Sequence, residues 1–540
     1  MKTVQRSLLA AGAALTVLAV AGGAVRADGP NDHAARAQDL IMANDFDEAR
    51  KELGRGRVDD PAIALERARL SLYEADCDGA LVVLSSPDVA KTEQGAMLAD
   101  IARGCARITA ATVLDEDRDQ GVWIRYQDEN DRALTPLIVD TVVKARDALT
   151  RDLGATWPKP TRIVVVRDLL SLSAMTGLPY ESAQTTGTVA VAKWGRVTLL
   201  SPRASMHGYA WRDTMAHELT HLAVTRSTID RAPLWLQEGV AKREEVRWRE
   251  PGPFDDRPSP DAIAARGIEL KLDLPLDKLG PSIAMLPSAD AALVAFSEVT
   301  SFVRYFATNT PPGTLERLFA ALREGKEPDA ALEVASSANL KQWDTRWRAY
   351  LASKPKETLP ARLSLGKERP NLRDIRERVR LAELLVGRDH PAEALTELDR
   401  LQAPAGKPPA ANGGPPVDDP SYRYLRGRVL LALGGEGRTK EAEVLFQEPK
   451  EVLASYGPWW AVRGVLARVR GDGSSAETSF AEAVATDPFD LEAACEVLDA
   501  PPSASTPAST GLSAPPVTSK DPNPLCQTAR AWKVPALGQD

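Results

Sequence analysis

The stretch Trp211-Arg-Asp-Thr-Met-Ala-His-Glu-Leu-Thr-His-Leu-Ala-Val224 decides how this 540-residue chain is interpreted. It contains neither Gly nor Pro, and its pattern predicts one continuous helix. His217 and His221 are four residues apart, so both imidazoles lie on one face of that helix and can bind the same metal ion. Glu218 can then act as general base toward a metal-bound water. The alternative is two exposed histidines on an ordinary helix, but the chain has only five histidines, which makes a chance match rare.

A zinc site needs a third protein ligand, and the segment Ala232-Pro-Leu-Trp-Leu-Gln-Glu-Gly-Val-Ala241 offers one. Pro233 suits the first turn of a second helix. Glu238 lies in otherwise apolar surroundings, where a carboxylate is costly unless it is paired or bound to a metal. Asp230 is the rival ligand, but the polar connection around it favours a turn or a cap. We predict one Zn²⁺ per chain, with the ligands His217, His221 and Glu238.

These residues resemble the gluzincin metallopeptidases, in particular the peptidase MA-like group related to thermolysin and the zinc aminopeptidases. The motif HELTH at 217–221 matches, and Trp235-Leu-Gln-Glu-Gly-Val-Ala241 is similar to the aminopeptidase sequence Trp-Leu-Asn-Glu-Gly-Phe-Ala. The resemblance extends over about half of the chain, from residue 122 to residue 350, and outside the metal motifs it is one of pattern only. It implies that the chain hydrolyses peptide bonds, with Glu218 activating water and zinc bound by His217, His221 and Glu238.

The chain departs from the family pattern in three ways. The connection from the second histidine to Glu238 is slightly shorter than in the large aminopeptidases. The motif Gly-Ala-Met-Glu-Asn, which anchors a free N-terminus in those enzymes, is absent, and this argues against aminopeptidase activity. Those relatives also carry an oxyanion-stabilising tyrosine on a later helix, where the best alignment places Phe296. Tyr305 is half a helical rotation away and cannot substitute, so His207 or Tyr209 could supply the electrophile, unless both are ordinary surface or packing residues.

Phe296 keeps a second interpretation open, in which a helical-repeat scaffold carries a peptidase-like domain that binds zinc, or only folds, without cleaving peptides. Glu218 favours the enzyme, because a scaffold has no evident need for a general base between two metal ligands. A zinc hydrolase that acts on a non-peptide amide is a third, weaker interpretation.

The N-terminal residues favour an exported protein, in the periplasm or outside the cell. Lys2 and Arg6 precede the apolar run 8–25, and Val25-Arg26-Ala27 offers a small-residue cleavage site, which together predict a signal peptide. No cysteine follows the run, so we expect no lipoprotein anchor, while an uncleaved anchor remains an alternative because of the run's length. No later segment is long and apolar enough to span a membrane, and we expect no membrane association beyond the export signal.

Charge and cysteine content restrict the partners and the compartment. The formal net charge of −8 argues against nucleic acid as a partner. The four cysteines form two pairs that are local in sequence, and an oxidising compartment would permit a disulfide in each. Buried free thiols are an equal alternative for both pairs, which are Cys77 with Cys105 and Cys495 with Cys526.

The predicted fold class is α+β, with a zincin-like metallopeptidase domain, built from a small mixed sheet and an active-site helix, flanked by all-α tetratricopeptide-like repeats. Small residues recur at repeat spacing in the N-terminal region, as in Ala37, Leu40, Ala49 and Leu53, then Ala68, Ala80 and Leu84. The predicted parts are a signal peptide (1–27), an N-terminal helical repeat-like region (28–112), the metallopeptidase domain (113–355), tetratricopeptide-like repeats (356–500) and a disordered tail rich in Pro, Ser and Ala (501–540).

Within the metallopeptidase domain, short strands are predicted at 122–126, 161–166, 187–192 and 196–200, with a helix at 132–153 and further helices within 290–352. The last two strands flank residues 193–195 and predict a hairpin directly before the histidine helix. In zincins an edge strand above that helix pairs with an extended peptide substrate. Either strand of the hairpin is the candidate, and a hairpin buried within the sheet is the alternative.

The C-terminal third carries the clearer repeats. Each buries an amphipathic helix pair against its neighbour, and an array forms a concave surface, which predicts binding of a protein substrate or an assembly partner. A Pro/Gly/Ala-rich loop at 402–420 interrupts the array. The positions that fit the repeat register are Trp460, Gly464, Ala467, Ala476, Phe480, Ala483 and Pro488 in one repeat, Ala382, Leu385, Ala394, Leu398 and Leu401 in a second, and Gly427 to Phe446 in a third.

Overall fold

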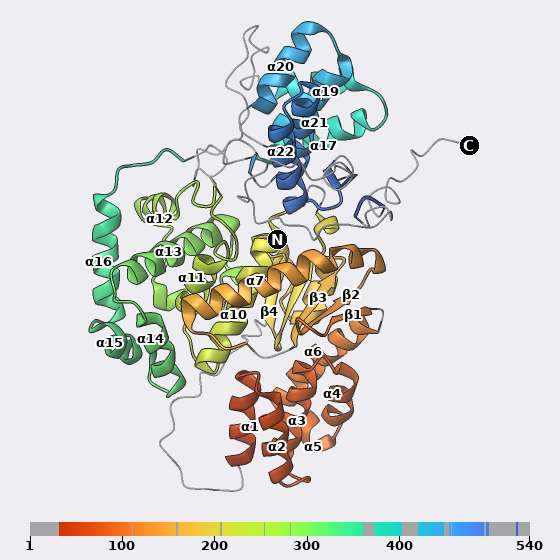
Figure 1. Ribbon diagram of the computed structural model, residues 1–540. Helices are drawn as coiled ribbons and strands as arrows, with labels where there is room; N and C mark the ends of the chain where they lie inside the picture. Colours follow the sequence, from red (N-terminus) through yellow and green to blue (C-terminus); the bar gives the residue numbers. More distant parts are fainter. Residues whose placement is uncertain are drawn as a thin grey trace, which may run out of the picture.

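We describe the protein from a computed structural model (Figure 1). The described residues are 32–110, 112–157, 160–205, 208–252, 254–280, 282–359, 365, 372–401, 420–447, 453–454, 456–490, 493–495 and 525–527. The predicted signal peptide, His207, the loop interior at 402–419 and nearly all of the predicted tail therefore lie outside the described residues. No helix in the described part of the chain has both the length and the apolar character needed to cross a membrane.

A small mixed sheet of five strands lies at the centre of this α+β fold (Figure 1). The strand order is β1-β2-β3-β5-β4, in which β2, β3 and β5 run parallel while β1 and β4 run antiparallel at the two edges. The predictions for β2, β3 and β5 are confirmed, and the strand expected at 187–192 begins three residues later. The sequence VLDED of β1 lacks an apolar alternation and was not predicted as a strand. The bounds are β1 Val113–Asp117, β2 Val122–Tyr126, β3 Thr161–Val166, β4 Ala190–Lys193 and β5 Arg196–Leu200.

The two faces of the sheet contribute to two different hydrophobic cores. All six residues of β3 are buried, and successive side chains point to opposite faces. Ile163 and Val165 join the core that contains residues of α7 (Thr135–Leu153) and α10 (Trp211–Thr228). Val164 and Val166 join a second core, which is built mainly from the N-terminal helices. Burial on both faces explains why residues 163–166 of β3 are an uninterrupted apolar run rather than an alternating one.

The N-terminal helices are packed directly onto the sheet. Within them, Ala37, Ala49, Ala68 and Ala80 are completely buried, as their small-residue spacing predicts. Their core also takes in residues of β3, β5 and α8 (Leu169–Thr176), so this region does not have a core of its own. We call it the N-terminal helical unit, and its helices are α1 Asp32–Met42, α2 Phe46–Arg55, α3 Pro61–Tyr73, α4 Cys77–Leu84, α5 Pro87–Ala90 and α6 Glu93–Thr109.

Further helices complete the region from β1 to α16, residues 113–353, which we call the central domain. The predicted helix at 132–153 starts with a 3-10 turn at Glu129–Leu134 before α7. The helices expected within 290–352 are present, and Trp343 and Trp347 are buried side chains whose indoles donate to Ser336 and Ser301 hydroxyls. The remaining helices are α9 Tyr180–Thr186, α11 Leu234–Glu244, α12 Pro260–Glu269, α13 Ala289–Thr308, α14 Thr314–Arg323, α15 Pro328–Ser336 and α16 Leu340–Ser353.

The three C-terminal helix pairs form where the register predicts them. Gly464 faces the ring of Phe480, and Gly427 faces the ring of Phe446, so that a side chain at either glycine would collide with its partner helix. Small residues at these crossings let paired helices approach closely. We call these the C-terminal helix pairs, and they are α17 Leu372–Val386 with α18 Pro391–Arg400, α19 Pro420–Leu433 with α20 Glu436–Gln447, and α21 Gly457–Val469 with α22 Gly473–Thr486.

Both cysteine pairs are disulfides, so the free-thiol alternative is wrong for each. Cys77–Cys105 joins α4 to α6 within the N-terminal helical unit. Cys495–Cys526 joins two short segments whose neighbouring residues Ala494 and Leu525 pack into the core of the central domain. The second disulfide thus ties residues beyond the last helix pair back to the central domain.

Candidate metal site

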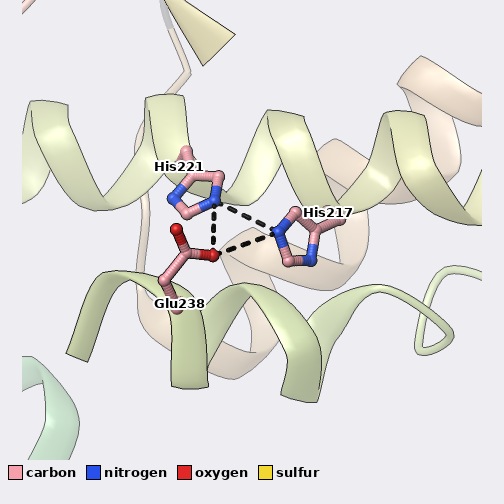
Figure 2. A group of neighbouring side chains, drawn as sticks. All are labelled: His217, His221 and Glu238. Atoms are coloured by element: carbon pink, nitrogen blue, oxygen red, sulfur yellow. Dashed lines mark hydrogen bonds and ion pairs between the residues drawn. The ribbon is translucent and has the colours of Figure 1, made fainter. Parts of the chain in front are cut away.

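The three predicted metal ligands come together between α10 and α11 (Figure 2). The Nε2 atoms of His217 and His221 are 3.2 Å apart. They lie 3.5 and 3.4 Å, respectively, from the same carboxylate oxygen of Glu238. One ligand atom from each residue therefore falls within 4.8 Å of the others, an arrangement that could hold one metal ion.

Asp230, the rival ligand, does not belong to this group. It follows the end of α10, where Ile229 and Asp230 both have positive φ angles of 53° and 55°. Two such residues reverse the direction of the chain between the two helices, which confirms the turn predicted around Asp230. The structure differs from the sequence prediction in one detail, because Pro233 is the residue before the first turn of α11 and not within it.

Gly239 allows α11 to lie close to α13. A side chain at this position would collide with Val303 and approach the carbonyl of Val299 within 2.6 Å. The Glu-Gly sequence of the motif thus has two separate uses: Glu238 faces the histidines, while the glycine lets the helix pack tightly against its neighbour.

Further side chains hold the two imidazoles in place. Nδ1 of His217 lies 3.2 Å from Oε2 of Glu245, whose carboxylate is bound in turn by Lys242 at 2.6 and 2.7 Å. Nδ1 of His221 lies 3.4 Å from Oε1 of Gln237. Hydrogen bonds at Nδ1 fix the ring orientation and leave Nε2 for a metal. Sequence reasoning missed this pair of partners, although Glu245 lies two helical turns after Glu238 and so on the same face of the helix.

Glu218 is held by the strand at the sheet edge. Its Oε2 accepts a hydrogen bond of 2.5 Å from the backbone N–H of Ala192 in β4. The side chain is buried next to the histidines, and burial raises the pKa of its carboxyl. Of the two strands proposed for the substrate edge, β4 lies at the edge and β5 is interior, so the candidate at 196–200 and the fully buried hairpin are both wrong.

Opposite charges dominate the electrostatics of the site. Burial lowers the pKa of His217, but hydrogen bonds to Glu238 and Glu245 outweigh it and raise this pKa to about 9. Burial raises the pKa of Glu238, but the charges of His221 and His217 outweigh it and hold this pKa well below its usual range. Without a metal, the carboxylates therefore retain a proton on the imidazoles, and a bound cation would displace that proton.

The candidate oxyanion groups differ in their positions. Phe296 lies edge-on to His217, with 6.5 Å between ring centroids. Tyr305 packs instead against Trp343 and Tyr350, at centroid distances of 6.2 and 4.8 Å. Tyr209 is partly buried, and its hydroxyl donates to the carbonyl oxygen of Leu200. This contact gives Tyr209 a packing role at the end of β5.

Comparisons with models of known protein families, with curated proteins and with solved structures found no match. The interpretation of the site therefore rests on its own geometry and on the motifs that supply its residues.

Proposed function

We propose that this protein is an exported zinc metallopeptidase of the gluzincin type, with a zincin-like domain over residues 113–355. The observation that carries the proposal is the convergence of two imidazoles and one carboxylate from two helices, beside a buried glutamate. Two nitrogen ligands and one carboxylate oxygen suit Zn²⁺, and three protein ligands leave a fourth coordination position for water or substrate. The donor set therefore fits the metal that the motif implies, with the ligands His217, His221 and Glu238.

The proposed mechanism uses Glu218 as general base. When bound, zinc would lower the pKa of a water molecule and polarise the scissile carbonyl. Glu218 takes a proton from the attacking water and delivers it to the leaving amine. The N–H of Ala192 orients this carboxylate.

We propose that an extended peptide pairs with β4. This strand lies at the edge of the sheet, where one side of β4 pairs with β5 and the opposite side pairs with no strand of the described sheet. Backbone groups at a sheet edge can form a ladder with an added strand. Because Ala192 in β4 touches Glu218, a peptide bound along this strand would lie next to the general base.

The first test measures zinc and cleavage in the same samples of mature protein. Elemental analysis should find one zinc per chain, which Glu238→Ala should lose. A peptide library should be cleaved by the zinc-loaded protein, and a chelator should abolish cleavage. Glu218→Gln is the matched control, because it should keep the zinc and lose cleavage by a factor of about 10² to 10⁴.

The second candidate function is a zinc-binding scaffold without peptidase activity, and Phe296 beside His217 favours it because no phenolic hydroxyl is supplied there. Zinc without cleavage of any library peptide would support the scaffold, and cleavage of a non-peptide amide alone would support a different hydrolase. Absence of zinc from protein purified without chelator would overturn both zinc hydrolases and leave only a scaffold whose peptidase-like domain folds without zinc.

Two further proposals concern location and partners. The two disulfides favour an oxidising compartment, and N-terminal sequencing of the mature protein should find Asp28 as its first residue. We also propose that the C-terminal helix pairs bind a protein substrate or an assembly partner. A pull-down in which deletion of 356–500 leaves every partner bound would contradict this.

A further inference from the structure

The turn of the β4–β5 hairpin is enclosed by the N-terminal helical unit. Trp194 and Gly195 form this turn, both with positive φ angles. The indole of Trp194 is only 6% exposed and packs edge-on against Tyr73 at the end of α3, with 5.9 Å between ring centroids. A side chain at Gly195 would meet Tyr73 at 2.9 Å and Asn44 at 3.1 Å. The turn has no room to move without moving the N-terminal helices.

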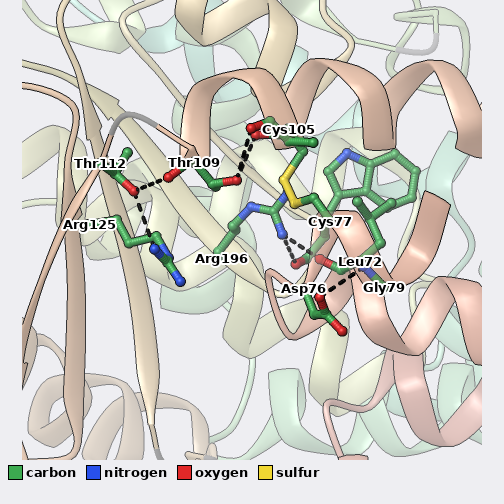
Figure 3. Close-up of a disulfide and its surroundings, with 11 residues drawn as sticks. Leu72, Asp76, Cys77, Gly79, Cys105, Thr109, Thr112, Arg125 and Arg196 are labelled. Carbon is green, nitrogen blue, oxygen red and sulfur yellow. Dashed lines mark hydrogen bonds between the residues drawn. A yellow bond between two sulfur atoms is a disulfide. The ribbon is translucent and has the colours of Figure 1, made fainter. Parts of the chain in front are cut away.

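Arg196 links the hairpin to these helices through hydrogen bonds (Figure 3). It is the first residue of β5 and is fully buried. Its guanidinium donates to the carbonyl of Leu72 at 2.6 Å, to the carbonyl of Trp194 at 3.4 Å and to Sγ of Cys105 at 3.5 Å. Burial lowers the pKa of Arg196 to about 10, so the group remains charged at neutral pH.

The disulfide Cys77–Cys105 lies directly at this contact (Figure 3). It joins α4 to α6, while Leu72 belongs to α3, so three helices of the N-terminal helical unit surround one side chain from β5. A buried cation is costly without well-placed acceptors. Its acceptors here come from the helical unit and the turn, and the position of β5 relative to those helices is therefore closely determined.

The same hairpin reaches the general base. In the antiparallel pair, Lys193 is opposite Arg196 and Ala192 is opposite Val197. The N–H of Ala192 is the group that holds the carboxylate of Glu218. A displacement of β4 would therefore move this donor away from Glu218. The metal ligands belong to α10 and α11, whose core includes Ala190, Val197 and Leu199 of the hairpin but also many residues of α7 and α13, so we expect these ligands to move less than this donor.

We propose that the N-terminal helical unit positions the general base: Arg196, held by Leu72 and the Cys77–Cys105 disulfide, fixes the β4–β5 hairpin so that Ala192 holds Glu218. Arg196 is a positioning residue, since it acts through the hairpin and touches neither metal nor substrate. This inference rests on the proposed function and gives the N-terminal helical unit a role in the peptidase site rather than in partner binding.

The test compares Arg196→Met with Arg162→Met in the full mature protein. Arg162 lies on β3 on the same face of the sheet and is also buried, between the rings of Phe46 and Trp123 at 5.2 Å from each centroid. It therefore controls for the loss of a buried arginine against the N-terminal helical unit. Turnover is expressed per bound zinc, so that a loss of folded protein does not count as a loss of catalysis.

We expect Arg196→Met to lower kcat per zinc by about 10-fold or more, since part of the general-base contribution is lost. Zinc affinity should be unchanged, and Arg196→Lys should restore part of the activity because it keeps a buried donor. Arg162→Met should lower thermal stability and leave kcat per zinc within about 2-fold of the wild type. Equal kcat per zinc in Arg196→Met and the wild type, or an equal loss in Arg162→Met, would overturn the proposal.

Hydrogen exchange provides a readout that does not depend on activity. The hairpin segment 190–200 should exchange faster in Arg196→Met, while the helix 211–228 should not change. If Arg196→Met does not fold, Cys77→Ser/Cys105→Ser replaces it, with the same expected pattern at smaller amplitude. Unchanged exchange in the hairpin would overturn the proposal even if the wild type cleaves peptides. Faster exchange in Arg196→Met, together with a wild type that cleaves nothing, would contradict the peptidase function and retain the coupling.

Discussion

The N-terminal helical unit and the C-terminal helix pairs are built alike but packed differently. Both place small residues where paired helices cross. The core of the N-terminal unit includes Val164, Val166 and Leu200 from the sheet. The C-terminal pairs have cores formed by their own residues, within 379–429 and 446–493. Helix pairs of the same kind therefore share a core with the sheet in the N-terminal helical unit. In the C-terminal helix pairs they form separate cores.

The C-terminal pairs contact the central domain through α22 and the residues that follow it. The N–H of Tyr209 donates to the carbonyl of Thr486 at 3.1 Å, and Arg203 lies over the ring of Phe489. Both contacts involve the segment just before the histidine helix. We therefore expect two thermal transitions, one for the central domain together with the N-terminal unit and one for the C-terminal pairs, and the following predictions test this difference.

Removal of zinc should have the largest effect, and on one transition only. A ligand present at a thousand times its dissociation constant stabilises the folded state by about 4 kcal/mol. Chelation should therefore lower the transition of the central domain and leave that of the C-terminal pairs in place, as measured by scanning calorimetry. Glu238→Ala should show no response to chelator. A parallel fall of both transitions would show that the two regions unfold as one.

Matched glycine substitutions should separate the two regions next. A side chain at Gly104 in α6 would collide with the backbone carbonyl of Ala174 in α8, whereas one at Gly464 would meet the ring of Phe480. A backbone cannot rotate away as a ring can, so Gly104→Ala should cost about 3 kcal/mol and Gly464→Ala less. In chemical denaturation, Gly104→Ala should destabilise the unfolding transition of the central domain. Gly464→Ala should destabilise that of the C-terminal helix pairs. Equal losses in one transition would contradict the comparison.

Glu298 should make the central transition depend on pH. This carboxyl on α13 is fully buried, accepts a hydrogen bond from the N–H of Leu274 at 3.3 Å, and has its pKa raised by burial to about 8. A raised pKa means that the folded state holds the proton more tightly, so the stability it confers is complete below the unfolded pKa and is lost as pH rises through about 8.

Glu298→Gln keeps an acceptor for Leu274 and cannot ionise. As the pH rises from 5 to 9, the free energy of unfolding of Glu298→Gln should increase by on the order of 2 kcal/mol relative to that of the wild type. Melting curves across this range test the expectation, and the C-terminal transition serves as the internal control. An identical pH dependence in both proteins would mean that the carboxyl is not held neutral.

The smallest expected effect concerns two arginine ion pairs. Arg226 near the end of α10 bonds to Asp45 at 2.8 Å and also to the carbonyl of Ala43, both between α1 and α2. Arg470 pairs with Glu443 at 3.0 Å among the C-terminal helices and is more exposed. Arg226→Met should cost about 1 kcal/mol and Arg470→Met less than about 0.5 kcal/mol. If denaturant titrations showed that Arg470→Met loses more free energy of unfolding than Arg226→Met, the expected order of the two ion pairs would be wrong.

Short-range patterns were read correctly from the residues alone. The apolar run of β3, the uninterrupted helix around HELTH and the small-residue register of the helix pairs are all visible as residue patterns within one or two neighbouring elements, and the structure confirms them. The strand β1 was missed because an edge strand with a charged sequence owes its structure to pairing with β2. Glu245 was missed because its partner, His217, lies on another helix.

The sequence by itself determined the residues of the candidate metal site, since helical geometry puts His217 and His221 on one face and an apolar setting marks Glu238. The tertiary structure alone decided that β4 and not β5 forms the sheet edge, that both cysteine pairs bond, and that the N-terminal helices share a core with the sheet. These outcomes depend on which distant surfaces pack together. Residue spacing specifies the face of a helix or a strand but not the partner that covers it.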